Sequence, residues 1–145
     1  MPISKRTIKR IVKAKYTEIW QECWDHQDTG RYTYEIFPKI SLKRFKTDHH
    51  YVQASTNHGK FPVYYKRFLN KKLNCPCGAN SVQADAKHYI FSYPLMDNIR
   101  QAHFPRDYAT RSIAFLFTDY YCAKGIINII KKVNANLITQ DEANM

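Results

Sequence analysis

Three residues near the middle of the chain, Cys75, Cys77 and His88, have the types and the spacing of metal ligands. Two thiols one residue apart can bind the same ion, and Gly78 lets the backbone turn sharply around it. The histidine that follows would be the third ligand. The position where a fourth ligand would complete a tetrahedron is Tyr93, and a phenol with a pKa of about 10 is a poor zinc ligand at neutral pH. Residues 74–94 therefore resemble an incomplete zinc knuckle, which is either degenerate or completed from elsewhere.

His58 is the candidate that we favour for the missing ligand, because it lies in a tight turn beside Gly59, one short helix before the knuckle. A helix of about nine residues is only about 14 Å long, so the chain can fold back and bring that turn near Cys75. The alternative is a turn histidine that hydrogen-bonds to the backbone. Cys23 fits a small core residue better than a ligand, because it lies among the apolar positions of a helix.

The composition indicates one domain with a strongly basic first half. The chain has 145 residues, of which 44% are hydrophobic, which suits a single core. Residues 1–80 contain 16 Lys and Arg against 6 Asp and Glu, whereas residues 81–145 contain 7 against 6. The positive electrostatic field of such a first half suits a polyanionic partner, of which nucleic acid is the first candidate and an anionic membrane surface the second. The alternative is a basic surface without a specific partner.

The cellular setting follows from what the sequence lacks. No stretch approaches the roughly 20 apolar residues of a membrane span, so no membrane partner is expected. The first residues have no apolar run of a signal peptide, and the four cysteines are then expected to be free or metal-bound in a reducing compartment. We therefore expect an intracellular protein of the nucleus or the cytoplasm.

Apolar spacing predicts a mainly α fold, a small helical domain over residues 1–134 that contains the Cys-Cys-His loop, and a flexible tail over residues 135–145. The predicted helices cover residues 7–24, 42–54, 61–69, 94–102 and 120–134. Residues 32–37 alternate weakly and predict a short extended segment. Residues 107–119 fit a helix, although 113–117 fit a buried strand equally well.

Aromatic residues of the first and third predicted helices should form much of the core. We expect Trp20 and Trp24 to pack against Phe61 and Phe68, because burying such side chains dominates a core of this size. The second helix, 42–54, should direct Leu42, Phe45, His49 and Val52 inward.

Basic residues on the same two helices are candidates for contacts to nucleic-acid phosphates. They are Lys5, Arg6, Lys9, Arg10 and Lys13 in the first helix, and Lys60, Lys66, Arg67, Lys71 and Lys72 around the third. Positive charge at a helix N-terminus opposes the macrodipole, so it either serves binding or forms a solvated face. Tyr64 or Tyr65 could stack on unpaired bases, whereas core packing suits Phe61 and Phe68.

The order of the motifs resembles a known family. The motifs are Trp20-Gln-Glu-Cys-Trp24, Gly30-Arg31-Tyr32-Thr33, Thr56-Asn57-His58-Gly59-Lys60-Phe61 before Tyr64 and Arg67-Phe68, Cys75-Pro-Cys77-Gly78, His88-Tyr-Ile-Phe91 and Arg100. This set resembles the C-terminal region of the Pol polyprotein of arthropod-type non-LTR (LINE-like) retrotransposons, over roughly Tyr16 to Arg100. In that family the segment follows the reverse transcriptase and ribonuclease H domains. The family commonly has Gly-His-Gly where this chain has Asn57-His58-Gly59, and Cys in place of Tyr93.

The resemblance implies a nucleic-acid-associated accessory segment of a reverse transcriptase. Its expected partners are RNA or single-stranded DNA, and the reverse transcriptase and ribonuclease H part of the parent polyprotein. The alternative is a structural or protein-interaction fragment of a truncated or decayed Pol polyprotein, which packs against the rest of that polyprotein and has no independent activity.

Catalysis by this chain is not expected. A polymerase needs paired aspartates for two metal ions, and the sequence has no adjacent Asp pair. The twelve acidic residues are scattered, unlike the clustered carboxylates of ribonuclease H. A nucleophile pair of Cys77 with His58 or His88 has no accompanying oxyanion-forming arrangement, and metal binding explains these residues better.

Overall fold

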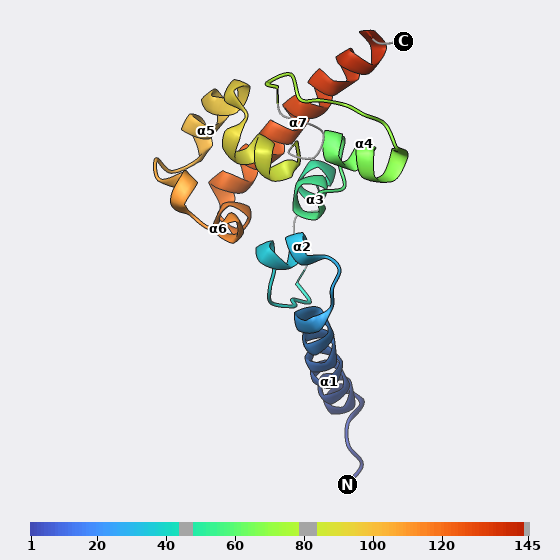
Figure 1. Cartoon of the computed structure of the whole chain (residues 1–145). Coiled ribbons are helices and arrows are strands. Elements are labelled where there is room, and N and C mark those ends of the chain that lie inside the picture. The colour runs from blue at the N-terminus through green and yellow to red at the C-terminus, as the bar shows by residue number, and fades with distance from the viewer. Residues whose placement is uncertain (44–47, 79–83, 144–145) are drawn as a thin grey trace.

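The computed structural model describes residues 1–43, 48–78 and 84–143, with side chains up to Ala135. Within these ranges every regular element is helical, which confirms the predicted mainly α class (Figure 1). The α-helices are α1 (Lys5–His26), α2 (Arg31–Ile36), α3 (His49–Thr56), α4 (Pro62–Leu69), α5 (Asp97–His103), α6 (Ile113–Thr118) and α7 (Tyr120–Ala143). The π-helical turn η1 (His88–Ser92) and the 3₁₀ turns η2 (Pro94–Met96) and η3 (Tyr108–Thr110) complete the set.

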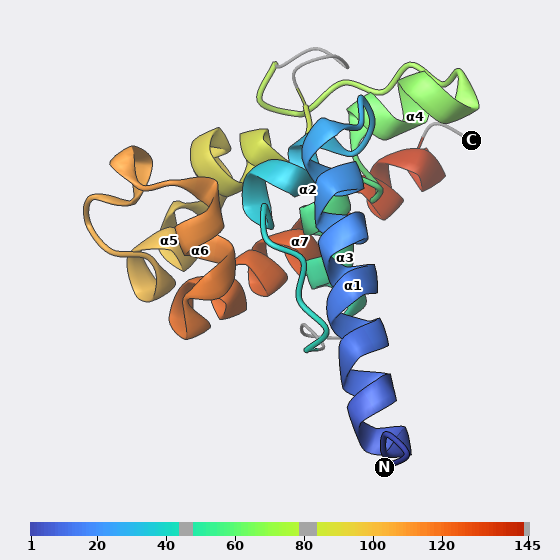
Figure 2. The same cartoon turned by 90° about the horizontal axis from the view of Figure 1, so that it is seen from below.

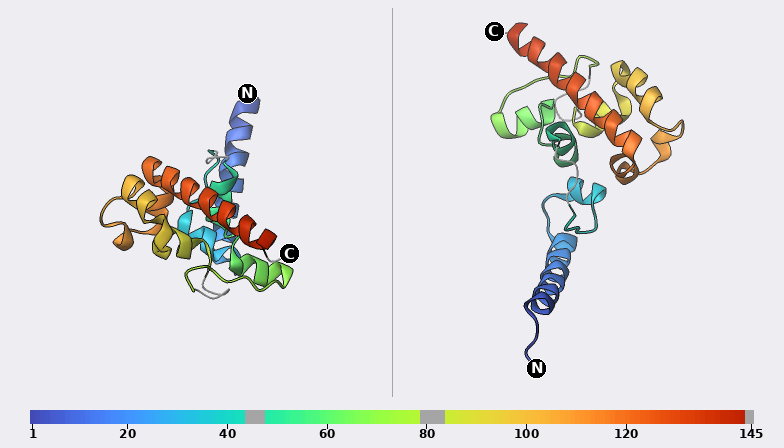
Figure 3. Two further views of the ribbon diagram at one scale, coloured as in Figure 1. Left: turned by 90° about the horizontal axis from the view of Figure 1, so that it is seen from above. Right: turned by 180° about the vertical axis from the view of Figure 1, so that it is seen from behind.

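Helix α7 forms the centre of the helical body, and α3, α5 and α6 pack around it (Figures 1 and 3). Its largest buried side chains are Ile126, Ile129, Ile130 and Val133, and they share one core with Leu116, Phe117 and Met96. Gly125 permits a close approach of the end of α5, because a Cβ there would lie 2.6 Å from the His103 Cβ. The helix continues beyond residue 134 to Ala143, while the predicted flexibility of the tail stays a prediction.

Helix α1 projects away from this body and contributes no buried residue (Figures 1 and 2). The prediction that Trp20 and Trp24 pack against Phe61 and Phe68 is therefore wrong. Trp20 is 52% exposed and Phe68 is 52% exposed, whereas the buried Phe61 stacks on Tyr89. Apolar spacing shows that a helix has a face that can be buried, but it does not show what covers that face.

The C-terminal end of α1 is attached to the segment that follows it. The indole of Trp24 donates a hydrogen bond from Nε1 to the Phe37 carbonyl (2.9 Å), and its ring lies 5.6 Å from that of Tyr34. The guanidinium of Arg31 donates to the Trp24 carbonyl (2.6 Å) and lies 4.4 Å from the Tyr34 ring centre. These contacts fix the last turn of α1 and leave its first turns free of packing.

Residues 31–36 form the helix α2, so the prediction of an extended segment over 32–37 is wrong. Gly30 begins this helix with a φ of 68°, a conformation that glycine adopts readily. The hydroxyl of Tyr32 donates to the Ala54 carbonyl (2.7 Å), and that of Thr33 donates to the Ser55 carbonyl (2.9 Å). These bonds satisfy carbonyls near the end of α3. The tertiary hydrogen bonds therefore decided the conformation of residues 31–36, and the weak alternation of apolar residues did not.

Two other predicted elements differ in their bounds. The helix predicted over 42–54 begins only at His49, because Asp48 caps α3 through bonds from the amides of His50 and Tyr51. Val52 is 46% exposed, Leu42 is 51% exposed and His49 is exposed as well, so these three fail as core positions. Phe45 lies outside the described residues. The open choice over 113–117 is settled as the helix α6, which Ser112 caps through a bond from the Phe115 amide (3.2 Å).

Candidate metal centre and basic surface

The three predicted ligands Cys75, Cys77 and His88 lie together in the structure. The two sulfur atoms are 3.3 Å apart, and the Nε2 of His88 lies 3.3 Å from the Cys77 Sγ and 3.4 Å from the Cys75 Sγ. Zinc lies about 2.3 Å from sulfur ligands and about 2.0 Å from nitrogen ligands, so donors at these separations can share one ion. Two thiols and an imidazole are also the donor types that zinc prefers, and the group can therefore bind a metal ion.

Short-range hydrogen bonds hold the three ligands in place. The Gly78 amide donates to the Cys75 carbonyl (3.0 Å), and Gly78 has a φ of 93°, which closes the turn between the two thiols. The amide of His88 donates to the Asp85 carboxylate (2.9 Å), which begins the turn that carries the histidine. The Tyr93 amide then closes η1 with a bond to the His88 carbonyl (2.9 Å).

Burial sets the electrostatics of this group. It raises the pKa of the Cys75 thiol and lowers the pKa of the His88 imidazole, the latter against the opposing effect of the Asp85 carboxylate. The neutral thiol and the neutral imidazole are therefore favoured when no cation is present. A bound metal ion would favour the thiolate instead, because a ligating thiol is deprotonated.

Tyr89 lies beside the metal ligands and was not identified from the sequence as part of the site. Its hydroxyl is buried and makes no hydrogen bond of regular geometry. Burial, and then its interaction with Cys75, raise the pKa of this phenol, so it remains a hydrogen-bond donor. A thiolate at Cys75 would be a stronger acceptor for that donor than the thiol, so the position of this hydroxyl suits a bound metal ion.

Arg100 supports the metal loop from behind. Its side chain is only 2% exposed and donates to three carbonyls around η1: those of Ile90 (2.7 Å), Tyr89 (3.0 Å) and Tyr93 (2.7 Å). Asp97 accepts the remaining bond, at 2.5 Å. In the sequence, Arg100 was noted only as the last of the motifs that carry the family resemblance. A buried cation with carbonyl partners has no local sequence signal, so this role required the structure.

The fourth ligand position remains occupied by a phenol. Tyr93 is buried, its ring centre lies 5.9 Å from that of His88, and burial raises its pKa, which disfavours the phenolate that a metal would need. The structure does not bring His58 to the group of three. The His58 ring instead lies 5.7 Å from that of Tyr64 and 5.5 Å from that of Phe68. Ligation by His58 stays a prediction.

A second set of ligand-type atoms belongs to Asp48, His49 and His50. The Asp48 carboxylate already accepts two amide bonds as the cap of α3. Burial lowers the pKa of His50 most, and the charge of His49 lowers it further. Asp48 opposes these effects, and the positive charge of Lys131 adds a smaller lowering. A helix N-terminus beside a lysine is a poor environment for a cation, so the knuckle group is the better metal centre.

The predicted phosphate-binding residues form two exposed groups. Lys5, Arg6, Lys9, Arg10 and Lys13 are exposed on the projecting helix α1, and Lys66, Arg67, Lys71 and Lys72 are exposed on α4 and just after it. Lys60 is half-buried. None of these ten side chains forms an ion pair with an acid in the part of the chain that the structure describes. None of the described helices has the length and the apolar character needed to cross a membrane.

Comparison with known proteins identifies the class to which this segment is related, the Pol polyproteins of non-LTR retrotransposons. One relative is the "Retrovirus-related Pol polyprotein from type-1 retrotransposable element R1" of Bradysia coprophila, 27% identical over 106 residues, or 68% of this chain and 10% of the polyprotein. Another is the corresponding polyprotein of element R1 2 of Nasonia vitripennis, 28% identical over 98 residues, or 64% of this chain and 23% of the polyprotein.

These matches confirm the predicted resemblance to retrotransposon Pol polyproteins. The aligned segment spans only a small part of each relative, so the chain corresponds to a short section of a much longer protein. No protein-family model and no solved structure matches the chain significantly.

Proposed function

We propose that this chain is a nucleic-acid-binding accessory segment of a LINE-like retrotransposon Pol polyprotein, without catalysis of its own. It would bind RNA or single-stranded DNA through α1 and the α4 region. The observation that carries the proposal is the set of ten basic side chains without acidic partners in the described chain. Phosphates would be their counterions, and releasing condensed salt ions would drive the association.

The Cys75–Cys77–His88 group would bind zinc in this proposal. Zinc would cross-link the turn at residues 75–78 to η1, and it would thereby hold the end of α4 and the basic residues 71 and 72 in a fixed position. The role proposed for the ion is structural, because the ion would join two segments of the chain. A structural zinc in small peptides contributes on the order of 10 kcal/mol to folding at pH 7, and a three-ligand site would contribute less.

A second function, docking to the rest of the polyprotein, has one specific observation in its favour. Helix α1 exposes a row of apolar side chains beside its basic ones. These are Ile8, Ile11, Val12, Tyr16, Ile19 and Trp20, each at least 45% exposed. An amphipathic helix without a partner in the described chain is typical of a surface that another protein segment covers.

Salt dependence separates the two functions. The experiment measures binding of the zinc-loaded chain to a fluorescein-labelled single-stranded RNA by anisotropy, over a series of salt concentrations. Phosphate binding predicts a linear fall of log affinity with log salt, with a slope of about −0.7 for each phosphate contact to a single strand. Replacing Lys5, Arg6, Lys9, Arg10 and Lys13 by Gln should lower the affinity and reduce the slope.

The matched control removes the same number of charges elsewhere. It replaces Arg106, Arg111, Lys124, Lys131 and Lys132, which are all exposed and lie in the second half of the chain, by Gln. This variant should keep most of the wild-type slope. If both variants bind as the wild type does, or if the wild type does not bind, the basic helix is only a solvated surface and docking becomes the better function.

A further inference from the structure

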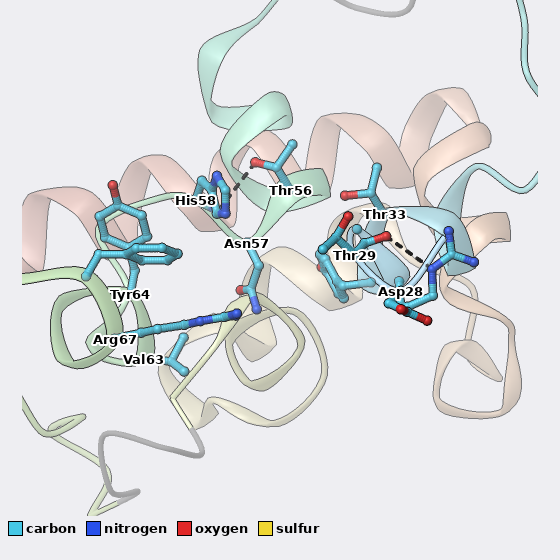
Figure 4. Close-up of a pocket in the computed structure, with 13 residues that line it drawn as sticks. Asp28, Thr29, Thr33, Thr56, Asn57, His58, Val63, Tyr64 and Arg67 are labelled. Carbon is cyan, nitrogen blue, oxygen red and sulfur yellow. Dashed lines mark hydrogen bonds between the residues drawn. The ribbon is translucent and has the colours of Figure 1, made fainter. Parts of the chain in front are cut away.

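A pocket of about 580 Å³ lies between the loop before α2 and the start of α4. Figure 4 shows its two sides: Asp28, Thr29 and Thr33 on one, and His58, Tyr64 and Arg67 on the other, with Asn57 between them. Ligand pockets in proteins have volumes of about 300–1,000 Å³, so this one can hold a small ligand or one unit of a polymer. It is separate from the group that would bind the metal.

Aromatic rings form one side of the pocket. The ring centres of Tyr64 and Phe68 are 4.8 Å apart, and that of His58 lies 5.7 Å and 5.5 Å from them. Phe68 is 52% exposed, and His58 is exposed as well. A core role does not explain these two rings, since neither is buried. Exposed aromatic rings at a pocket are suited to stacking on a flat ligand.

The polar groups beside the rings are mostly unused donors. The guanidinium of Arg67 makes no hydrogen bond or ion pair in the described part of the chain, and it extends toward Asn57 in Figure 4. The Asn57 side-chain oxygen accepts from the Ala86 amide (2.9 Å), which leaves its amide hydrogens as donors. Donors of this kind match phosphate oxygens and the carbonyl edges of bases.

Two of the motifs noted in the sequence, the one at residues 30–33 and the one that begins at Thr56, meet at this pocket. Residues 30–33, 56–58, Tyr64, Arg67 and Phe68 all line it, although they lie in three separate stretches of the sequence. Some of these residues have structural roles, as the bonds of Tyr32 and Thr33 to the end of α3 show. Asn57 has a φ of 60°, a conformation that asparagine adopts more readily than most residues, so its place in this turn has a structural reason. The exposed His58 and Arg67 contact the Phe68 ring, but none of these three residues belongs to the buried core.

We propose that this pocket binds one unpaired nucleotide of a single-stranded nucleic acid, with the base stacked on His58, Tyr64 and Phe68 and its phosphate held by Arg67. The inference rests on the proposed nucleic-acid binding and adds a base-dependent site to it. The basic residues of α1 sense only the charge of the backbone, whereas the pocket requires an unpaired base, so it selects single strands over duplexes.

The experiment compares two probes on the zinc-loaded full chain: a fluorescein-labelled oligouridylate of roughly ten nucleotides, and the same oligomer with abasic sugars throughout. The wild type should bind the base-containing probe roughly tenfold more tightly, since a base that stacks on aromatic rings adds to the affinity. Phe68→Ala should remove that difference, because it removes an exposed stacking ring at no cost to the core. Arg67→Gln should weaken binding of both probes.

Two control variants lie outside the pocket. Tyr121→Ala removes a ring that is 68% exposed on α7, and Lys66→Gln removes one charge from α4 beside Arg67. Tyr121→Ala should keep the difference between the probes, and Lys66→Gln should weaken binding less than Arg67→Gln. If the wild type binds both probes equally and Phe68→Ala changes nothing, the pocket inference is overturned while charge-driven binding stands. If the wild type binds neither probe, the proposed function fails as well.

Discussion

Replacing Arg100 tests the packing behind the metal loop most directly. The substitution Arg100→Met keeps much of the apolar volume and removes every donor, which leaves the carbonyls of Tyr89, Ile90 and Tyr93 without this partner. Each buried polar group left unpaired costs about 1–3 kcal/mol. The variant no longer has to bury a charged guanidinium, and this gain offsets part of the cost of the unpaired carbonyls. We expect a net loss of about 3–5 kcal/mol in the free energy of unfolding, the range for breaking a buried charged network.

The assay is urea unfolding of the chain in excess zinc, followed by far-ultraviolet circular dichroism. In a thermal melt of a chain of this length, the same loss in the free energy of unfolding corresponds to a fall of about 10 °C in the melting temperature. Arg100→Lys provides a graded variant, since it keeps the charge but its ammonium group lacks the planar fork of donors that reaches the three carbonyls. Its loss should be roughly half as large.

Arg111→Met is the matched control, because Arg111 forms an exposed pair with Asp107 (2.8 Å), with the arginine side chain 44% exposed. An exposed pair contributes at most about 1 kcal/mol, so this variant should unfold almost as the wild type does. The reasoning would be refuted if Arg100→Met and Arg111→Met lost the same small amount. That result would mean that water or a local rearrangement satisfies the carbonyls of η1.

Three other predictions concern separate parts of the chain. Tyr93→Cys should raise zinc affinity in a chelator-competition titration by supplying a fourth ligand. His58→Ala tests the ligation predicted for His58: a marked loss of zinc affinity would establish His58 as a ligand, whereas unchanged affinity would limit its ring to the contacts with Tyr64 and Phe68. Cys122 should resist alkylation at pH 8 while the exposed Cys23 reacts, because burial and then Asp119 raise the pKa of the Cys122 thiol to about 12. Equal alkylation of both cysteines would contradict the burial of Cys122. In the unfolded chain this thiol loses its proton near pH 9, so the contribution of Cys122 to the free energy of unfolding should fall as the pH rises above 9. Gly125→Ala should lower the melting temperature, because the new methyl group would clash with His103 and Phe104. This clash should outweigh the helix propensity of alanine, which exceeds that of glycine by about 1 kcal/mol. A higher melting temperature would show that α5 can shift.

Local chemistry was predicted from the sequence more successfully than tertiary packing. The triad of Cys75, Cys77 and His88 was predictable because a short loop restricts where its ligands can lie, and a metal requires specific donor types. Most helices were predictable because their apolar positions recur with the helical period.

The failures have a common physical cause, which is that they depend on distant partners. Helix α2 needed the hydrogen bonds that Tyr32 and Thr33 make to residues 54 and 55, and a six-residue helix has little period to detect. The exposed position of Trp20 depends on the absence of a packing surface for α1 among the described elements. The pocket is lined by residues from three stretches of the sequence. The sequence could therefore indicate its aromatic residues and its arginine as candidates, but it could not show that they lie together.

The isolation of α1 affects when this helix forms. An unsupported helix of 22 residues is marginally stable in water, and the like charges of its first turns repel one another. We therefore expect its first turns to open and close rapidly, with amide hydrogens that exchange with solvent far sooner than those of α7. A polyanion would neutralise the repulsion and order the helix as it associates, so part of the binding free energy would be spent on ordering. An unfolded arm also reaches farther than a helix, which widens the distance over which a strand can first be captured.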